Sequence, residues 1–454
     1  MRVLLVNPHQ RELVARRGKI YNRVWTPLSA ANCAALLERD GHEAVIVDAN
    51  ALGLGPAEVA RMAAGFDKIF VTSSELDRWQ CPVIDIQPFI DTVQALRGVG
   101  GDLYVTGAHG TVRPQEILEL TGALALVRGE PEMTVLEICS GGDPAAIPGL
   151  SLRVGGQFVS TPSREPFDLA QLPLPAFHLL PMDRYHYEVM GSRFTLLEGS
   201  RGCASRCSFC LRKMYGGCVR TKSAGQLIGE IDAVVKRFGV RNVYFMDLEF
   251  TFNRALVVEV CEHLIAARYD LTWTCQTRFD LVDERLLRLM RRAGCDLIHF
   301  GVEAADDIAL GALGKGVTVE QIRAGMRLVK QAKIRTACFF LMGYFGATAP
   351  DMERIVRFAR ELNPTYALFH IAVPYPGTRF HAEVMRSGGA FSDDGLFPEA
   401  YVGAMSLQQI KAAARRAHLG YYLRPRYLLS LASGASLRRW RQQARLFAGM
   451  VANR

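Results

Sequence analysis

Short apolar runs alternate with helix-length amphipathic segments over residues 1–140. The apolar runs that predict β-strands are Val3–Val6, Ala44–Val47, Lys68–Thr72, Leu103–Thr106 and Ala123–Val127. Between the first two runs, Pro27–Arg39 carries apolar residues at helical spacing and stops at Asp40-Gly41. Such regular alternation of short strands and helices predicts a doubly wound parallel sheet. In sheets of this kind, ligands bind beyond the carboxyl ends of the strands.

A second alternation of strands and helices runs from residue 194 to about residue 375. Its predicted strands are Phe194–Glu198, Asn242–Met246, Thr272–Gln276, Leu297–Val302, Thr336–Met342 and Tyr366–Val373. Several of the intervening helices begin at residues that favour the N-cap, namely Ser223, Asn253, Asp283 and Thr318. Six β/α units predict a partial barrel, because a closed TIM barrel has eight.

The remaining segments predict a connector and a helical C-terminal region. Leu150–Val154 and Gln157–Ser160 flank Gly155-Gly156, which predicts a hairpin. Prolines then space out an extended segment up to residue 193. We therefore expect an α/β chain with four parts: residues 1–140 as a doubly wound sheet, 141–193 as a connector, 194–375 as a partial barrel, and 376–454 as a helical region.

Composition places the chain among globular proteins with two to three domains. Its 454 residues are 49% hydrophobic and 22% charged. No apolar run approaches the ~20 residues of a membrane helix. The N-terminus lacks the pattern of a signal peptide, so a cytoplasmic location is expected. The odd number of cysteines, eleven, fits reduced thiols and metal better than disulfides.

The net charge of +9 is concentrated in the C-terminal tail. No acidic residue follows Glu399, whereas the tail carries the basic residues Lys411, Arg415, Arg416, Arg424, Arg426, Arg438, Arg439, Arg441, Arg445 and Arg454. Apolar positions at helical spacing around Ile410, Ala414 and His418 predict a helix. Such a helix either covers a domain with its arginines outward or lies on an anionic membrane surface. Nucleic acid is not expected as a partner, because no binding module accompanies the basic tail.

Three cysteines carry the most specific chemical signal in the chain. Cys203, Cys207 and Cys210 are spaced C-x3-C-x2-C on a loop that follows a predicted strand. Three thiolates can hold three irons of a [4Fe–4S] cluster and leave one iron open. Zinc is the alternative metal, but structural zinc sites use four ligands, and Cys218 is poorly spaced to be the fourth. Three buried free thiols are the remaining alternative.

The cysteine motif, with Phe209 before its third cysteine, resembles the signature of radical S-adenosylmethionine (SAM) enzymes. The resemblance implies that the open iron binds the amino and carboxylate groups of SAM. Reduction of the cluster would then cleave SAM to a 5′-deoxyadenosyl radical, which abstracts hydrogen from the substrate. An external electron donor is implied as well.

The resemblance extends to residues at the carboxyl ends of the later barrel strands. Asp247 and Glu249 follow the second strand and resemble acidic residues that accept from the SAM ammonium. Arg278 follows the third strand, and its planar fork suits the SAM carboxylate. Glu303 follows the fourth strand and matches a glutamate near the SAM ribose or amino group. Gly343 follows the fifth, where close backbone approach to adenine is expected. The alternative for each polar residue is a solvated rim or a helix cap.

The N-terminal sheet resembles the cobalamin-binding domain of one large radical SAM subgroup. The supporting pieces are Thr26-Pro27-Leu28, Gly41-His42-Glu43, Gly107-Ala108-His109 and Val127-Arg128-Gly129-Glu130, in this order. The strand ends at Asn7, Ser73, Gly107 and His109 are expected to hold the cofactor. The D-x-H-x-x-G motif that supplies a histidine to cobalt is absent, so neither His9 nor His109 is assigned as a cobalt ligand. A sheet with only a structural or substrate-binding role is the alternative.

The chain therefore resembles cobalamin-dependent radical SAM enzymes, and the expected activity is methyl transfer to an unactivated carbon or phosphorus centre. A radical cyclase, oxidase or ring-remodelling enzyme is the alternative within this class. An iron–sulfur or zinc-binding protein without catalytic activity is the alternative outside it. The expected substrate is a small molecule of the natural-product type. The sequence indicates neither its identity nor the catalytic residues.

Overall fold

The protein was analysed as a computed structural model, which describes residues 1–9, 24–74, 85–215, 217–393 and 395–434. It divides into two compact units. The first comprises Met1–Cys203 and Arg212–Met246, and the second comprises Ala204–Leu211 and Asp247–Arg454. The limits of the four parts expected from the sequence stay a prediction.

The first unit contains a seven-stranded sheet, and its predicted strands are confirmed. Its strands are β1 (Arg2–Asn7), β2 (Glu43–Asp48), β3 (Lys68–Thr72), β4 (Asp102–Thr106), β5 (Ala125–Val127), β6 (Leu150–Val154) and β7 (Gln157–Ser160). Their order is β2-β1-β3-β4-β5-β6-β7, and the pairs from β2 to β5 are parallel. Because the chain crosses from β2 over β1 to β3, the sheet is doubly wound with a switch point beside β1.

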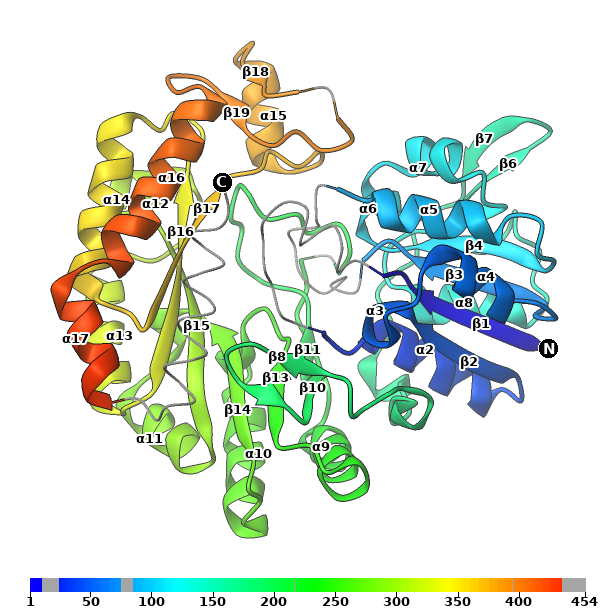
Figure 1. Cartoon of the computed structure of the whole chain (residues 1–454), viewed down its shortest axis with the longest axis horizontal. Helices are drawn as coiled ribbons and strands as arrows, with labels where there is room; N and C mark the ends of the chain where they lie inside the picture. Colours follow the sequence, from blue (N-terminus) through cyan, green and yellow to red (C-terminus); the bar gives the residue numbers. More distant parts are fainter. Residues whose placement is uncertain (10–23, 75–84, 216, 394, 435–454) are drawn as a thin grey trace. The chain divides into compact units, whose positions relative to one another are not determined.

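Helices pack on this sheet because each has one apolar face. They are α2 (Leu28–Arg39), α3 (Ala49–Leu52), α4 (Pro56–Met62), α5 (Gln87–Leu96), α6 (Ala108–Val112), α7 (Pro114–Thr121) and α8 (Pro131–Cys139). Helix α2 packs beside α8, and α4 packs beside α5 (Figure 1). The strands between them are apolar on both faces, as parallel strands covered by helices must be. Leu4, Val71 and Val105 are fully buried.

The predicted hairpin at 150–160 is confirmed, and it extends the sheet. Strand β6 pairs antiparallel with β5, and β7 pairs antiparallel with β6. The proline-rich segment that follows is mostly irregular, with two short 3₁₀ turns, Leu169–Gln171 and Phe177–Leu179. The first half of the expected connector thus forms the edge of the N-terminal sheet.

The first unit also contains the start of the second series. Its strands here are β8 (His186–Tyr187), β9 (Gly191–Ser192), β10 (Phe194–Leu197), β11 (Ser200–Arg201), β12 (Arg220–Thr221) and β13 (Asn242–Phe245), with helix α9 (Ala224–Phe238). Strands β10 and β13 pair in parallel, joined by α9. The predicted N-cap is confirmed, because the Ser223 side chain accepts from the Gln226 N–H.

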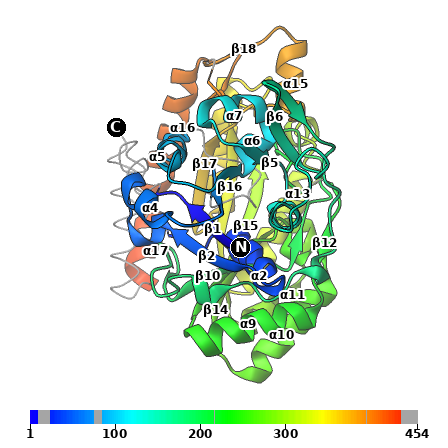
Figure 2. The same cartoon turned by 90° about the vertical axis from the view of Figure 1, so that its right-hand side faces the viewer.

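The second unit continues the series with four parallel strands. These are β14 (Thr272–Thr277), β15 (Cys295–Glu303), β16 (Arg335–Met342) and β17 (Tyr366–Ile371), side by side in this order (Figure 1, Figure 2). The helices are α10 (Arg254–Ala267), α11 (Glu284–Arg292), α12 (Asp307–Ala312), α13 (Val319–Gln331) and α14 (Ala349–Leu362), with 3₁₀ turns η3 (Phe250–Phe252) and η4 (Phe279–Leu281). Side-chain N-caps at Asn253, Asp283 and Thr318 are confirmed.

The C-terminal region is helical, as predicted. It contains α15 (Arg379–Arg386), the strand pair β18 (Ala390–Phe391) and β19 (Tyr401–Val402), α16 (Leu407–Tyr422) and α17 (Pro425–Gly434). Helix α16 packs on β17, where the Tyr422 hydroxyl donates to the Ala367 carbonyl over 3.0 Å. Ile410 and Ala414 are buried, whereas Arg415 and Arg416 are exposed. This helix therefore covers its domain with its arginines outward.

The most basic part of the tail lies outside the described residues, including Arg438, Arg439 and Arg441. Within the described part of the chain, no helix is both long enough and apolar enough to cross a bilayer.

Candidate functional site

The second half of the cysteine motif belongs to the second unit and is held there by backbone hydrogen bonds. The Ser208 N–H donates to the Leu313 carbonyl over 2.8 Å, and the Phe380 N–H donates to the Ser208 carbonyl over 2.9 Å. Gly314 has φ +65°, and a Cβ there would lie 2.7 Å from the Arg206 carbonyl oxygen. The turn after α12 therefore needs a glycine to approach the cysteine segment this closely.

Cys207 and Cys210 are half-buried beside a positive group. A hydrogen bond from Cys210 lowers the pKa of Cys207 to about 7, and the charge of Lys315 contributes to this shift. The thiolate is the form of cysteine that binds metal. Phe209, between the two cysteines, is half-buried as well.

Cys203 closes the first stretch of the first unit and is half-buried. Among the described residues, no three or more Cys, His, Asp or Glu side chains lie close enough together to bind one metal ion. The support for a cluster is thus the spacing of the three cysteines along the chain. Cys275, Cys295 and Cys338 are buried core thiols. Cys218 is exposed.

Glu303 lies at the end of β15 in a strained backbone conformation. Its φ is +68°, and the register between β15 and β16 shifts between Gly301 and Glu303. Its carboxylate is buried and accepts from Lys315, with 3.1 Å between Oε1 and Nζ. A left-handed conformation at a residue other than glycine costs free energy, and such strain clusters at functional sites.

Lys315 is a site residue that the sequence analysis missed. Burial alone would lower its pKa, but Glu303 and the thiols of Cys207 and Cys210 hold the pKa above its ordinary value. The ammonium is therefore charged and faces both the carboxylate and the cysteine segment. In the sequence, Lys315 is marked only by its position between Gly314 and Gly316. Its pairing with Glu303 is a tertiary contact that the sequence does not indicate.

Arg278 follows β14 as predicted, but its guanidinium already binds a neighbouring carboxylate. Its Nε and Nη2 donate to the two carboxylate oxygens of Asp280, each over 2.9 Å. Nη1 donates to the Ser205 hydroxyl and to the Lys315 carbonyl, and Nη2 also donates to the Gly316 carbonyl. Asp280 and Ser205 were not singled out in the sequence. Asp280 could have been noticed in the sequence, because it is an acidic residue only two positions after Arg278 in the turn that follows β14.

Glu249 lies in the same polar group of the second unit. Its Oε1 accepts from the Ser205 hydroxyl over 2.7 Å and lies 3.9 Å from Nε of Arg278. Asp247 and Glu249 are both buried. The structure therefore brings Glu249, Arg278, Glu303 and the unforeseen Lys315 together with the Cys207 segment.

Gly343, at the end of β16, needs to be a glycine for a reason that the sequence did not indicate. It has φ +73°, and a Cβ there would lie 2.8 Å from Cδ1 of Ile410 on α16. The space is filled by a side chain of the C-terminal helix. Packing thus explains this glycine without reference to a ligand.

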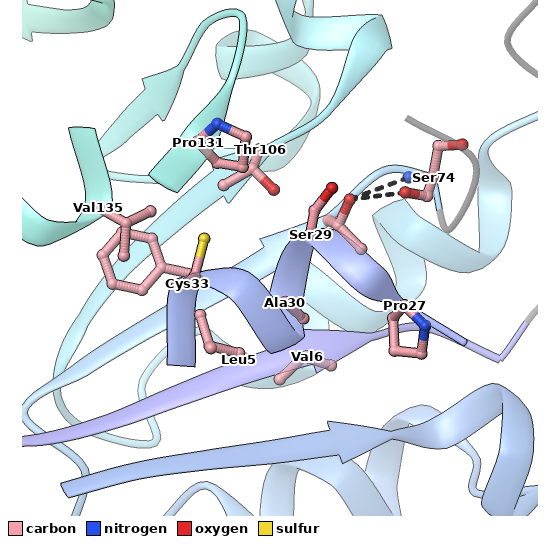
Figure 3. Close-up of a pocket in the computed structure, with 12 residues that line it drawn as sticks. Leu5, Val6, Pro27, Ser29, Ala30, Cys33, Ser74, Thr106, Pro131 and Val135 are labelled. Carbon is pink, nitrogen blue, oxygen red and sulfur yellow. Dashed lines mark hydrogen bonds between the residues drawn. The ribbon is translucent and has the colours of Figure 1, made fainter. Parts of the chain in front are cut away.

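The first unit has its own cavity at the carboxyl ends of β1, β3 and β4, between these strands and helices α2 and α8 (Figure 3). Its volume is about 30 Å³, which is room for roughly two water molecules. The lining is largely apolar with a few hydroxyls, and consists of Leu5, Val6, Pro27, Ser29, Ala30, Cys33, Phe70, Thr72, Ser74, Thr106, Pro131 and Val135.

The four strand-end residues expected to hold a cofactor do not line this cavity. Asn7 donates to Asp48 over 2.9 Å, and Nδ1 of His109 lies 2.8 Å from the Ser73 hydroxyl, in both cases inside the unit. Gly107 has φ +108° and is the N-cap of α6. The neighbouring residues Val6, Thr72 and Thr106 line the cavity instead, because successive strand residues face opposite sides of a sheet.

Buried Asp48 is the centre of the polar group on the other side of the sheet. It accepts from Asn7, from the Tyr185 hydroxyl over 2.8 Å and from the Ala51 N–H. Burial raises the pKa of Asp48 to about 6, although the donated hydrogen bonds oppose this rise.

Comparison with known protein families matches residues 197–359 to the radical SAM superfamily. This segment contains the three cysteines together with Arg278 and Glu303.

Two curated relatives cover most of the chain. An uncharacterised methyltransferase of Pyrococcus horikoshii is 27% identical over 448 residues, covering 94% of each chain. An anaerobic magnesium-protoporphyrin IX monomethyl ester cyclase of Rubrivivax gelatinosus is 29% identical over 392 residues, covering 83% of this chain and 68% of the relative.

Two solved structures share the fold over nearly the whole chain. One is the radical SAM methyltransferase TsrM from Kitasatospora setae, with cobalamin and a [4Fe-4S] cluster bound; it has a TM-score of 0.69 and 18% identity, covering 92% of this chain and 84% of that one. The other is the cobalamin-dependent radical SAM enzyme OxsB, with aqua-cobalamin and SAM bound; it has a TM-score of 0.74 and 17% identity, covering 100% and 71%. The fold class expected from the sequence is confirmed.

Proposed function

We propose, from the premise that this protein is a radical SAM enzyme, that it is a cobalamin-dependent methyltransferase acting on an unactivated carbon or phosphorus centre. One observation carries the proposal: the chain that bears the cysteine motif also has a doubly wound N-terminal sheet with a switch point beside β1, where such sheets bind ligands. The similarity over 94% of the chain to a protein named as a methyltransferase supports this choice.

Cys203, Cys207 and Cys210 would hold the [4Fe–4S] cluster. Three cysteines leave one iron without a protein ligand, which suits the chelation of SAM. The lowered pKa of Cys207 favours the thiolate that this role needs.

Asp247, Glu249, Arg278, Glu303 and Gly343, with Phe209, are the proposed surroundings of SAM. Glu303 and Glu249 are buried carboxylates, so either can accept from an ammonium group in a low-dielectric site. Arg278 would act mainly through its charge, because Asp280 occupies its fork. Lys315 orients Glu303 by donating to its carboxylate.

Cobalamin would bind at the carboxyl edge of the N-terminal sheet, because doubly wound sheets bind their ligands there. The cavity at this edge is too small to hold the cofactor by itself. When bound, the cluster and SAM supply the 5′-deoxyadenosyl radical, and cobalamin carries the methyl group. The protein's part is to position these groups and to exclude water.

A radical cyclase is the second candidate, because a relative with this activity in its name is 29% identical over 392 residues. Both candidates use the same residues around SAM. They differ in what becomes of the SAM methyl group.

SAM labelled on its methyl group distinguishes the two. The reconstituted, reduced enzyme should transfer the label to its product and release S-adenosylhomocysteine together with 5′-deoxyadenosine. An unlabelled product, with 5′-deoxyadenosine as the one coproduct from SAM, would favour the cyclase. Because the substrate is a small molecule of unknown identity, extracts fractionated by size provide the first substrate source.

A further inference from the structure

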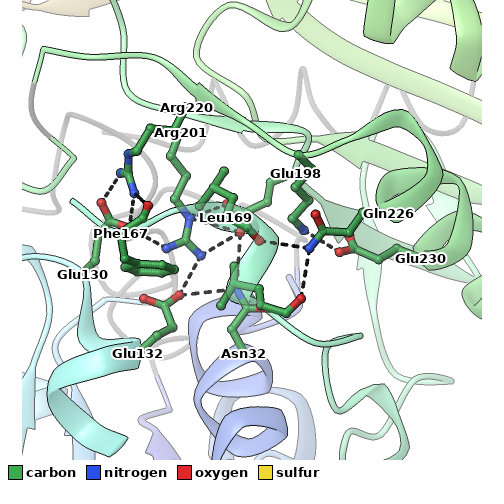
Figure 4. A network of polar contacts seen from close by, with 12 residues as sticks. Asn32, Glu130, Glu132, Phe167, Leu169, Glu198, Arg201, Arg220, Gln226 and Glu230 are labelled. Carbon is green, nitrogen blue, oxygen red and sulfur yellow. Dashed lines mark hydrogen bonds and ion pairs between the residues drawn. The ribbon is translucent and has the colours of Figure 1, made fainter. Parts of the chain in front are cut away.

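A buried arginine of the first unit has its charge balanced inside the protein. Arg201 donates to Glu130 over 2.7 Å, to Glu132 over 2.6 Å and to Glu198 over 2.8 Å (Figure 4). Glu130, in the turn between β5 and α8, accepts from Arg220 as well. A buried charge needs such partners, because an unpaired one is costly to remove from water.

The arginines of the two C-terminal helices have no acidic partners. Arg415 and Arg416 on α16 and Arg426 on α17 are exposed, and within the part of the chain that the structure describes none of the three has a hydrogen bond or an ion pair. Arg424, between the two helices, donates to two backbone carbonyls and to Oδ1 of Asn363, which are all neutral groups. The positive charge of these helices is therefore not balanced by the protein around them.

A lysine of α13 adds to this positive charge. Lys330 donates to the Leu362 carbonyl over 2.6 Å. Partial burial lowers the pKa of Lys330, and the charge of Arg426 lowers it further. No acidic residue follows Glu399 in the sequence. This end of the second unit thus attracts anionic partners.

Apolar side chains are exposed among these arginines. Leu423, Leu428 and Leu429 are 51%, 47% and 69% exposed, where α17 follows directly on α16 (Figure 1). Tyr427 is buried instead, and its hydroxyl donates to the Thr365 carbonyl over 3.1 Å. Because Tyr427 fixes the orientation of α17, its neighbours Leu428 and Leu429 are held toward solvent. Exposed apolar groups surrounded by polar residues mark interaction sites.

Helical spacing places both kinds of side chain on one face of α16. Arg415, Leu419 and Leu423 follow one another at intervals of four residues, so they lie along one face, with Arg416 beside them. The opposite face, which includes the buried Ala414, packs on β17. Packing against the domain therefore leaves the basic and apolar face of this helix uncovered.

We infer that the two C-terminal helices bind the surface of an anionic lipid membrane. The surface concerned, here called the C-terminal surface, consists of Arg415, Arg416, Leu423, Arg424, Arg426, Leu428 and Leu429. Its arginines bind lipid phosphates, and its leucines insert among the headgroups. A nucleic acid would pair with the arginines and leave the leucines in water, whereas a membrane interface takes up both. The inference goes beyond the proposed function and does not depend on it.

The test is sedimentation of the full-length protein with lipid vesicles. Vesicles of phosphatidylcholine with about 30% phosphatidylglycerol are anionic, whereas vesicles of phosphatidylcholine alone are neutral. At about 0.1 M salt the protein should bind the anionic vesicles about tenfold or more tightly than the neutral ones. Raising the salt to about 0.5 M should remove most of this difference, because the salt screens the arginines.

Arg426→Gln combined with Leu428→Ser tests the assigned surface. Each basic residue near an anionic membrane strengthens binding by about fivefold, and the loss of an inserted leucine weakens it further. The double variant should therefore bind anionic vesicles about tenfold or more weakly than the wild type.

Arg61→Gln combined with Met62→Ser is the matched control. These residues are on α4 of the first unit, where Arg61 is exposed and Met62, like Leu428, is 47% exposed. The control removes the same charge and a similar exposed apolar side chain, so it should bind the anionic vesicles within about twofold of the wild type. Substitutions at such exposed positions have little effect on stability, so both double variants should fold.

Three results would overturn the inference. Equal binding of the wild type to the two kinds of vesicle would exclude an anionic membrane as the partner. Equal binding of the wild type and the Arg426→Gln, Leu428→Ser variant would exclude the C-terminal surface as the contact. Tighter binding to a DNA duplex than to anionic vesicles, unchanged by Leu428→Ser and Leu429→Ser, would identify nucleic acid as the partner. The iron content and the label transfer that test the proposed function are separate measurements, so either account can fail alone.

Discussion

Glu303 and Lys315 form a buried ion pair directly above a glycine. The carboxylate oxygen and the ammonium nitrogen are 3.1 Å apart. A Cβ on Gly301 would lie 2.2 Å from Oε1 of Glu303 and 2.4 Å from Nζ of Lys315. The pair can occupy its position only because position 301 has no side chain. The strained backbone of Glu303 and this glycine together set where the charges lie relative to the cysteine segment.

Gly301→Ala should displace the pair and weaken SAM binding. Introducing a methyl group into a packed site typically costs about 1–3 kcal/mol, so an increase in the SAM dissociation constant of about tenfold is expected. The measurement is SAM binding to the cluster-loaded protein. Gly311→Ala is the control, because nothing lies within 4 Å of its Cβ, and it should leave the affinity unchanged. Equal affinities of the two variants would remove the ion pair from the SAM site.

Arg278→Ala should also weaken SAM binding. Removal of the guanidinium leaves Asp280 and the buried Glu249 without their positive neighbour, which places excess negative charge near the SAM carboxylate. Losing one member of a buried charge pair typically costs about 2–5 kcal/mol, so a loss of about 30-fold or more is expected. Arg254→Ala is a suitable control, because it breaks an exposed pair with Asp283. SAM affinity that is unchanged in Arg278→Ala would exclude this arginine from the site.

The stability of the protein should depend on pH through Asp48. Its pKa is about 6 when folded, against 3.8 for the ordinary side chain, so the folded state binds the proton more tightly. The stabilisation by the proton is complete below about pH 4 and is lost as the pH rises through about 6. The free energy of unfolding of the wild type should therefore fall by about 3 kcal/mol over this window, relative to Asp48→Asn. Urea unfolding of both proteins at intervals between pH 4 and pH 7 measures it. A difference between the two proteins that stays constant with pH would show that Asp48 does not titrate in this range.

Bound cobalamin should have no histidine from the expected motif as a cobalt ligand. The D-x-H-x-x-G sequence is absent, and the ring of His109 is buried against Ser73. The EPR spectrum of the cob(II)alamin form should therefore lack hyperfine splitting from an imidazole nitrogen and should be the same in His109→Ala. Splitting in the wild type that vanishes in this variant would identify His109 as a ligand.

The strands and many helix starts could be predicted because their signals are local. Apolar runs place β3 at Lys68–Thr72, as observed, and hydroxyl or carboxamide side chains mark the N-caps at Ser223 and Asn253. Arg278 and Glu303 were singled out because they resemble residues of the family and lie just beyond predicted barrel strands.

The rest of the site depends on contacts that no local pattern contains. Lys315 becomes a site residue only through its pairing with Glu303. At the N-terminal sheet, the face of each strand that meets the cavity was not predictable, because strands that are apolar on both sides show no alternation. Asn7 was expected at the ligand site, but it bonds Asp48 instead, and its neighbour Val6 lines the cavity. The β5–α8 turn was recognised as a motif, but its role in holding Arg201 required the fold.

The most direct test of the account is the metal content of anaerobically reconstituted protein, measured together with its reductive cleavage of SAM. The wild type should contain about four irons per chain and form 5′-deoxyadenosine when reduced in the presence of SAM. Replacing Cys203, Cys207 or Cys210 by Ala should abolish both, whereas Cys275→Ala should retain both. Stoichiometric zinc, with no iron–sulfur absorption and no 5′-deoxyadenosine after reconstitution, would contradict the account.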